Sequence, residues 1–139
     1  MADLSGATLA GRTMALSELR GHVVVLNAWA SWCYPCRSEM PGLASVAHAT
    51  ASRGVAFLGI DEQDEPSAAR DFASSQHVPF GSLVDSDGRL LASLKVVSPN
   101  AIPSTLVLDA SGGIAARIIG PATVDELTAV LDRLAPPSS

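Results

Sequence analysis

The sequence predicts an α/β fold in which a central mixed β-sheet is flanked by helices and preceded by an N-terminal β-hairpin. Apolar segments of strand length alternate with helical segments through the first part of the chain, as in α/β layering. Two later apolar segments are joined by a turn sequence, which indicates an antiparallel pair. At 139 residues the chain fits a single domain, residues 1–139, with a core at about 16–134 and a disordered tail at 135–139.

The first elements follow from local patterns. Residues 7–16 alternate between polar and apolar, which is typical of a small hairpin, and residues 17–20 then turn the chain. Residues 23–28 form a continuous aliphatic run, which indicates a strand that is covered on both faces. A helix follows from Pro35 and ends where an arginine and a glycine, residues 53–54, supply a basic last turn and a stop.

The remaining elements follow the same rules. In chain order we expect a buried strand at 55–60, an acidic loop at 61–66, a helix at 67–75, strands at 105–108 and 114–119, and a last helix at 123–134. The two later strands flank a turn rich in Asp, Ser and Gly, so they should pair antiparallel. Thr123 and Glu126 form a capping-box pattern at the start of the last helix.

Charge and hydropathy exclude some classes of partner. The formal net charge is −5 with few, scattered lysines and arginines, so we expect no nucleic acid partner. No apolar run approaches the length of a membrane span. Residues 1–12 lack a basic start followed by an apolar stretch, so we expect no signal peptide here and a native leader or anchor that has been removed.

The two cysteines of the chain, Cys33 and Cys36, stand two residues apart at the expected start of a helix. A dithiol that exchanges disulfides needs two sulfurs close enough to bond and an activated first thiol. Unpaired N–H groups and the macrodipole at a helix N-terminus favour a negative sulfur on Cys33. Pro35 suits the first helical turn. The pattern therefore predicts Cys33 as the nucleophile and Cys36 as the resolving thiol.

Two other interpretations of the cysteine pair stay open at this point. Half of a zinc site has the same spacing, but the sequence has no second such pair and its three histidines are isolated. A purely structural disulfide would close a very small loop and restrict the unfolded chain only modestly. We expect no metal and no cofactor other than the redox-active disulfide.

Three segments of the chain carry a family resemblance. "VVVLNAWASWCYPCRSEMPGL", "VAFLGID" and "IPSTLVLDASGGIAARIIG" resemble the thioredoxin superfamily, and within it the TlpA/ResA-like thiol-disulfide oxidoreductases. The resemblance covers about residues 16–134 and implies a thioredoxin-like fold. Trp32 and Pro35 are general features of the superfamily, whereas Asn27 and Glu39 point to this branch. Thioredoxins proper have a buried acid where this chain has Asn27.

The resemblance also implies roles for particular residues. It assigns catalysis to Cys33, Cys36 and Glu39, with Glu39 handling protons, although the alternative for Glu39 is a solvated acid in the first turn of the helix. It assigns substrate binding to a second group: Trp32, Tyr34, Pro35, Ile102 and Pro103. Pro103 matches the cis-proline of the superfamily, although a trans proline is the general expectation for an X-Pro bond.

The expected function is the reduction of disulfides in exported proteins, for example at the haem-site cysteines of apocytochrome c. Oxidation is the less favoured direction. Expected partners are cysteine-containing exported proteins and a membrane thiol-disulfide electron donor, and the expected state is a monomer outside the cytoplasm. The alternatives are an oxidant of DsbE type and a non-catalytic module that binds a partner or copper. A peroxidase of peroxiredoxin type would need a Thr-x-x-Cys nucleophile, which the cysteine segment lacks.

Overall fold

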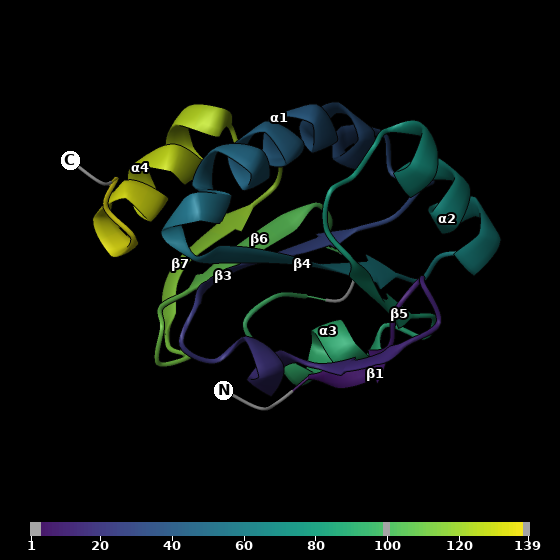
Figure 1. The fold of residues 1–139 in the computed structure, drawn as a ribbon. Helices are drawn as coiled ribbons and strands as arrows, with labels where there is room; N and C mark the ends of the chain where they lie inside the picture. The colour runs from purple at the N-terminus through teal and green to yellow at the C-terminus, as the bar shows by residue number, and fades with distance from the viewer. Residues whose placement is uncertain (1–3, 99–100, 138–139) are drawn as a thin grey trace.

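The computed structural model describes residues 4–98 and 101–137 (Figure 1). Its strands are β1 Ser5–Ala7, β2 Thr13–Ala15, β3 Val23–Trp29, β4 Val55–Glu62, β5 Ser82–Asp85, β6 Ser104–Leu108 and β7 Ile114–Ile119. Its α-helices are α1 Tyr34–Thr50, α2 Pro66–Ser75, α3 Arg89–Ser93 and α4 Val124–Leu134. Two short 3₁₀ helices follow β2 and α1: Leu16–Leu19 and Ala51–Arg53. None of the helices in the described ranges is long and apolar enough to cross a lipid bilayer.

The main sheet has five strands in the order β5-β4-β3-β6-β7, and β1 and β2 form a separate antiparallel hairpin. β3 pairs parallel with β4, and β4 pairs parallel with β5. β3 pairs antiparallel with β6, which in turn pairs antiparallel with β7. This arrangement confirms the predicted mixed sheet, the central place of β3 and the N-terminal hairpin.

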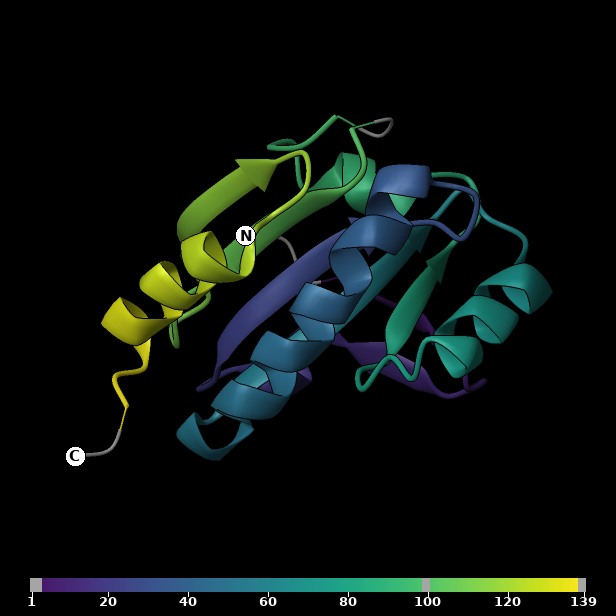
Figure 2. The same cartoon turned by 90° about the horizontal axis from the view of Figure 1, so that it is seen from above.

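Both faces of the sheet are covered, which explains why β3 is apolar throughout. Helices α1, α2 and α4 lie on one face, and α3 and the β1–β2 hairpin lie on the other (Figure 1; Figure 2 shows the helical face from above). Val23 and Val25 belong to the core beneath the three long helices, while Val24 and Leu26 belong to the opposite core. Alternate residues of one strand therefore fill two cores.

Trp29, at the end of β3, connects this strand with β4 and β5 through its side chain. Its side chain is fully buried, and its Nε1–H donates to Ser82 Oγ on β5 at 2.9 Å. The indole crosses β4 above Gly59, where an added Cβ would lie 2.7 Å from Trp29 Nε1. The ring also packs on Phe72 of α2, with centroids 5.5 Å apart. Glycine at position 59 is thus required by the close approach of the indole.

Most predicted elements are confirmed, and the differences concern short or extended strands. β5 and α3 were not predicted, and the expected acidic loop 61–66 is wrong at its start, because Asp61 and Glu62 continue β4 and are buried. Leu4 is buried in the second core, ahead of the expected core boundary. Of the expected tail 135–139, residues 135–137 have no regular secondary structure and 138–139 lie outside the described residues.

Candidate functional site

A disulfide joins Cys33 and Cys36 at the N-terminus of α1, with their Cα atoms 5.3 Å apart. Cys33 is the N-cap residue, and the backbone N–H of Cys36 donates to Cys33 Sγ at 3.3 Å. Pro35 occupies the first turn, where its missing N–H breaks no helical hydrogen bond. The predicted helix start at the cysteines is therefore confirmed.

This geometry distinguishes the two sulfurs. The Cys33 sulfur accepts from the N–H of Cys36 in the first turn of α1, and the positive end of the helix dipole also favours a negative charge on it. Cys33 retains 5 % of its exposure, whereas Cys36 has none. Only the first cysteine therefore offers a surface that an incoming disulfide can reach.

Exposed side chains border the disulfide. Trp32, Tyr34 and Pro35 are all exposed, although Trp32 and Tyr34 are large and carry apolar rings. Trp32 Nε1–H donates to the carbonyl oxygen of Gln63 at 2.9 Å, which fixes the indole at the surface. Exposed aromatic groups around a reactive centre are typical of a surface that contacts a partner.

Glu39 lies one helical turn beyond Cys36 and is only 6 % exposed. Its Oε1 accepts from Asn27 Nδ2 of β3 at 3.1 Å, and its Oε2 accepts from the backbone N–H of Ala122. Burial raises the pKa of Glu39 above its ordinary value, although the hydrogen bonds from Ala122 and Asn27 act to lower it. The alternative of a solvated acid in the first turn is therefore wrong.

The Ile102–Pro103 peptide bond is cis, as the resemblance implied, so the alternative of a trans proline is wrong. Pro103 is buried and directly precedes β6, whose Ser104 pairs with Ala28 near the end of β3. Its carbonyl oxygen accepts from the N–H of Gly120 at 2.9 Å. Ile102 packs against the core that contains both cysteines. The cis-proline loop therefore lies at the same end of the sheet as the end of β3, and the disulfide follows β3 in the chain.

Sequence reasoning missed a network of carboxyl groups beside this site. Asp64 accepts from the N–H of Ser31 at 2.7 Å and from Ser31 Oγ at 2.8 Å, and its negative charge acts on the buried carboxyl group of Asp61. The sequence signal is the acidic run after the second buried strand, which predicts an acidic loop. Within that run Asp61 and Glu62 are buried, and Asp64 contacts the segment before Cys33.

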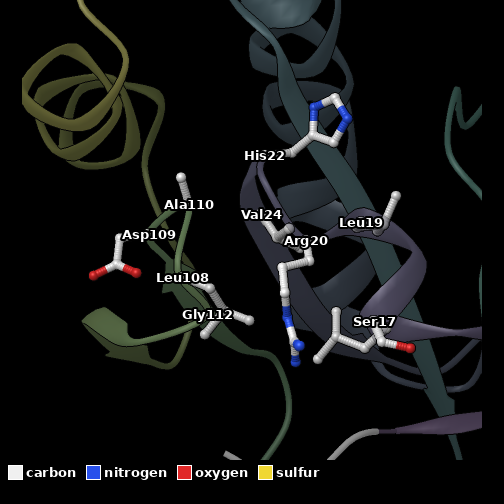
Figure 3. Close-up of a pocket in the computed structure, with 10 residues that line it drawn as sticks. Ser17, Leu19, Arg20, His22, Val24, Leu108, Asp109, Ala110 and Gly112 are labelled. Atoms are coloured by element: carbon white, nitrogen blue, oxygen red, sulfur yellow. The ribbon is translucent and has the colours of Figure 1, made fainter.

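A separate pocket lies at the opposite end of β3, between the first 3₁₀ helix and the turn that joins β6 to β7 (Figure 3). Ser17, Arg20, His22 and Asp109 contribute its polar side chains. Asp109 is held by its own turn, since its Oδ1 accepts from the N–H groups of Ser111 and Gly113. The pocket contains none of the predicted site residues. Within the part of the chain that the structure describes, no three His, Cys, Asp or Glu side chains gather as a metal site.

The chain is similar to known proteins in family, in sequence and in structure. The model of the AhpC/TSA family matches residues 1–117. The chain is 27 % identical to the thiol-disulfide oxidoreductase ResA of Bacillus cereus over 92 % of this chain and 72 % of the relative. It is 34 % identical to the thiol:disulfide interchange protein HelX of Rhodobacter capsulatus over 85 % of this chain and 64 % of the relative.

Solved structures agree with these similarities. A secreted thiol-disulfide isomerase of Corynebacterium glutamicum superposes with a TM-score of 0.89 at 33 % identity, covering 98 % of this chain and 83 % of that one. A DsbF homologue of Corynebacterium diphtheriae superposes with a TM-score of 0.91 at 30 % identity, covering 96 % and 85 %. Both structures share the fold of this chain, and the first is named as a thiol-disulfide isomerase.

Proposed function

Because the chain belongs to the AhpC/TSA family and to its thioredoxin-like thiol-disulfide oxidoreductases, we propose that Cys33 and Cys36 are its redox-active pair and that it reduces disulfides of exported proteins. The observation that carries this proposal is the disulfide at the N-terminus of α1. An enzyme of this class acts on cysteine-containing proteins, and the exposed rim of aromatic groups beside Cys33 offers a surface for them.

The proposed reaction transfers two electrons to the substrate. In the reduced enzyme the Cys33 thiolate attacks one sulfur of a substrate disulfide, and the other substrate sulfur leaves as a thiolate and takes up a proton. Cys36 then loses its proton and attacks the Cys33 sulfur of the mixed disulfide. The second substrate sulfur leaves, the substrate is released as a dithiol, and the Cys33–Cys36 disulfide remains.

Glu39 is the proposed proton acceptor for Cys36. The two residues are three positions apart on α1 and both are buried, so water has little access to the resolving thiol. A carboxyl group with a raised pKa is better matched to accept a thiol proton near neutral pH than an ordinary glutamate. Asn27, which replaces the buried acid of thioredoxins proper, holds Glu39 in place.

Trp32, Tyr34, Pro35, Ile102 and Pro103 are the proposed substrate-binding residues. In the family that this chain resembles, the residue before the cis-proline offers its backbone to an extended segment of the substrate. Main-chain pairing of that kind tolerates varied sequences. The exposed rings of Trp32 and Tyr34 would then contact side chains that flank the substrate cysteines.

Reduction is the proposed direction because the TlpA/ResA-like relatives most often act as reductants, with oxidation of DsbE type as the alternative. The test is the equilibrium reduction potential of the Cys33–Cys36 pair against glutathione. A potential of about −270 mV or below would support a reductant, and one of about −120 mV would support an oxidant. Insulin reduction that disappears in Cys33→Ser would exclude a non-catalytic binding module.

The relatives also support a proposal about compartment and partners. The solved isomerase of Corynebacterium glutamicum is a secreted protein, and we propose a location outside the cytoplasm for this chain as well. There it would act as a single-domain monomer without metal or other cofactor. It would draw electrons from a membrane thiol-disulfide donor and act on exported proteins such as apocytochrome c. Detection of its mixed disulfide with such a substrate, trapped in Cys36→Ser, tests this proposal.

The name of the AhpC/TSA family also suggests a peroxidase activity. A peroxiredoxin nucleophile needs a threonine three residues before the cysteine, and this chain has Ala30 before Cys33 and Cys33 before Cys36. We therefore expect no turnover of hydrogen peroxide or alkyl hydroperoxide. Measurable turnover would contradict the proposed assignment of the cysteine pair to disulfide exchange.

A further inference from the structure

The segment directly before Cys33 is tied to the loop that follows β4. Asp64 accepts two hydrogen bonds from Ser31, one from its N–H and one from its Oγ, at 2.7 and 2.8 Å. Trp32 Nε1–H donates to the carbonyl oxygen of Gln63 at 2.9 Å. Because Ser31 and Trp32 immediately precede Cys33, these contacts join the segment before the N-cap residue of α1 to the loop after β4.

A second carboxyl group, that of Asp61, interacts electrostatically with Asp64. Asp61 lies in β4 and is only 1 % exposed, and neither of its carboxyl oxygens accepts a hydrogen bond from any residue that the structure describes. A buried carboxylate without a donor is very unfavourable. A protonated Asp61 avoids this cost, because its O–H can donate to the neighbouring Asp64 carboxylate.

The charges around Asp61 favour its neutral form. Burial is the largest cause that raises the pKa of Asp61, to about 9, and the hydrogen bond to Asp64 and the negative charges of Asp64, Asp85 and Glu65 add to it. Burial also acts to raise the pKa of Asp64, but the hydrogen bonds from Asp61, Ser31 and Glu65 together lower it. The pair therefore divides into an acid on Asp61 and a carboxylate on Asp64.

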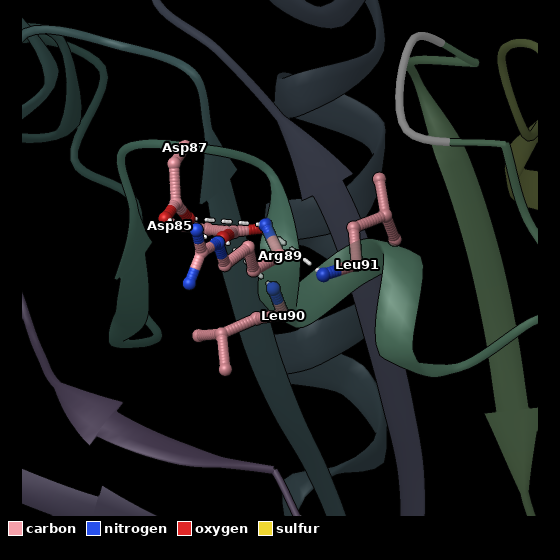
Figure 4. Close-up of polar contacts among 5 residues, drawn as sticks. All are labelled: Asp85, Asp87, Arg89, Leu90 and Leu91. Atoms are coloured by element: carbon pink, nitrogen blue, oxygen red, sulfur yellow. Dashed lines mark hydrogen bonds and ion pairs between the residues drawn. The ribbon is translucent and has the colours of Figure 1, made fainter.

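Other charged groups near Asp61 and Asp64, on β5, α3 and α1, make contacts of their own. Asp85 on β5 accepts from the N–H groups of Leu90 and Leu91, both at 3.0 Å (Figure 4). The guanidinium group of Arg89 pairs with Asp87 at 3.1 Å in the same view. On the helical face, the guanidinium group of Arg37 in α1 lies over the Phe72 ring of α2, 5.7 Å from its centre.

We propose that Asp61 is a positioning residue for the cysteine pair: as a neutral acid it donates to Asp64, which in turn fixes Ser31 and the start of α1. This inference rests on the proposed role of Cys33 as the attacking thiol. Loss of the Asp61 proton would replace a hydrogen bond by repulsion between two carboxylates. Asp64 would then hold Ser31 less firmly, and Cys33 would lose its orientation toward the helix amides.

The experiment compares the wild type with Asp61→Asn, whose amide still donates at every pH, and with Asp61→Leu, which cannot donate. Asp87→Asn serves as a matched control, because Asp87 is exposed and makes its contacts within the turn before α3. For each reduced protein one measures the rate of Cys33 alkylation by iodoacetamide from pH 6 to 10, with the adduct located by mass spectrometry. The equilibrium reduction potential is measured at pH 7.

At pH 7 we expect Asp61→Leu to react about tenfold more slowly than the wild type, the loss expected for one hydrogen bond to a charged group. At the same pH, Asp61→Asn should react at the wild-type rate. As the pH rises through about 9, the wild-type profile should depart from that of Asp61→Asn, because only the wild type loses the donor. Asp87→Asn should follow the wild type throughout.

Wild-type reactivity in Asp61→Leu, or parallel profiles of the wild type and Asp61→Asn up to pH 10, would overturn the role of Asp61. If Asp61→Leu does not fold, the comparison of the wild type with Asp61→Asn still decides. A wild-type Cys33 that reacts no faster than glutathione would contradict the proposed function, and this inference with it. A fast Cys33 in every variant would contradict the role of Asp61 alone.

Discussion

Replacing Glu39 by glutamine tests the proton-transfer step without removing the contacts of the side chain. A glutamine oxygen can still accept from the N–H of Ala122, and its amide can donate to Asn27 if the Asn27 amide rotates. The fold should therefore change in stability by no more than about 1 kcal/mol near pH 5. The resolving step should slow by about a hundredfold, the lower end of what general acid–base catalysis contributes.

The pH dependence of stability gives the same substitution a second, independent readout. Because the pKa of Glu39 is raised above the unfolded value of 4.5, its contribution to stability is complete below pH 4.5 and is lost as the pH rises through the folded pKa. Glutamine does not titrate, so the variant should gain stability relative to the wild type over that range. Urea unfolding at a series of pH values measures this difference.

The kinetic assay follows the decay of a preformed mixed disulfide on Cys33 by stopped flow, as a function of pH. Glu126→Gln is a suitable control, since Glu126 is exposed in the first turn of α4 and glutamine also completes a capping box. An unchanged rate and pH profile in Glu39→Gln would refute the proton-transfer role. It would leave Glu39 as a structural link between α1 and the loop before α4.

Four further changes test the packing and the separate roles of the two cysteines. Trp29→Phe removes the hydrogen bond to Ser82 and part of a buried ring, so the free energy of unfolding in urea should fall by about 2–3 kcal/mol. Gly59→Ala places a Cβ against the same indole and should lower it by about 1–3 kcal/mol, whereas an unchanged urea midpoint would contradict the close packing. Cys36→Ser should accumulate a stable mixed disulfide with a substrate peptide in mass spectrometry, and Cys33→Ser should form none.

Local chemistry made much of the site predictable from the sequence. Cys33 and Pro35 each suit a particular position at a helix start, and the structure places both in those positions. The aliphatic run in β3 predicted a strand covered on both faces, because no position in it was free to meet water. These features depend on neighbours in the chain, so a single sequence reveals them.

The features that were missed depend on residues far apart in the chain. The burial of Glu39 requires Asn27 from β3 and the Ala122 backbone, which is 83 positions away. Asp61 belongs to β4 because it pairs with Trp29 and Val84, and nothing in its acidic neighbourhood indicates a strand. Ser82–Asp85 is a strand through its pairing with β4, since four residues with polar ends carry too weak a pattern to predict one.

The ionisation of Cys33 in the reduced protein is the most direct measurement of whether α1 activates the first thiol. The rate of Cys33 alkylation, followed against pH with Cys36 replaced by serine, should rise to its plateau with a midpoint well below that of free cysteine, about pH 8.5. A midpoint near that of free cysteine would mean that the amide groups facing the sulfur do not stabilise its charge, and the mechanism proposed for this chain would fail.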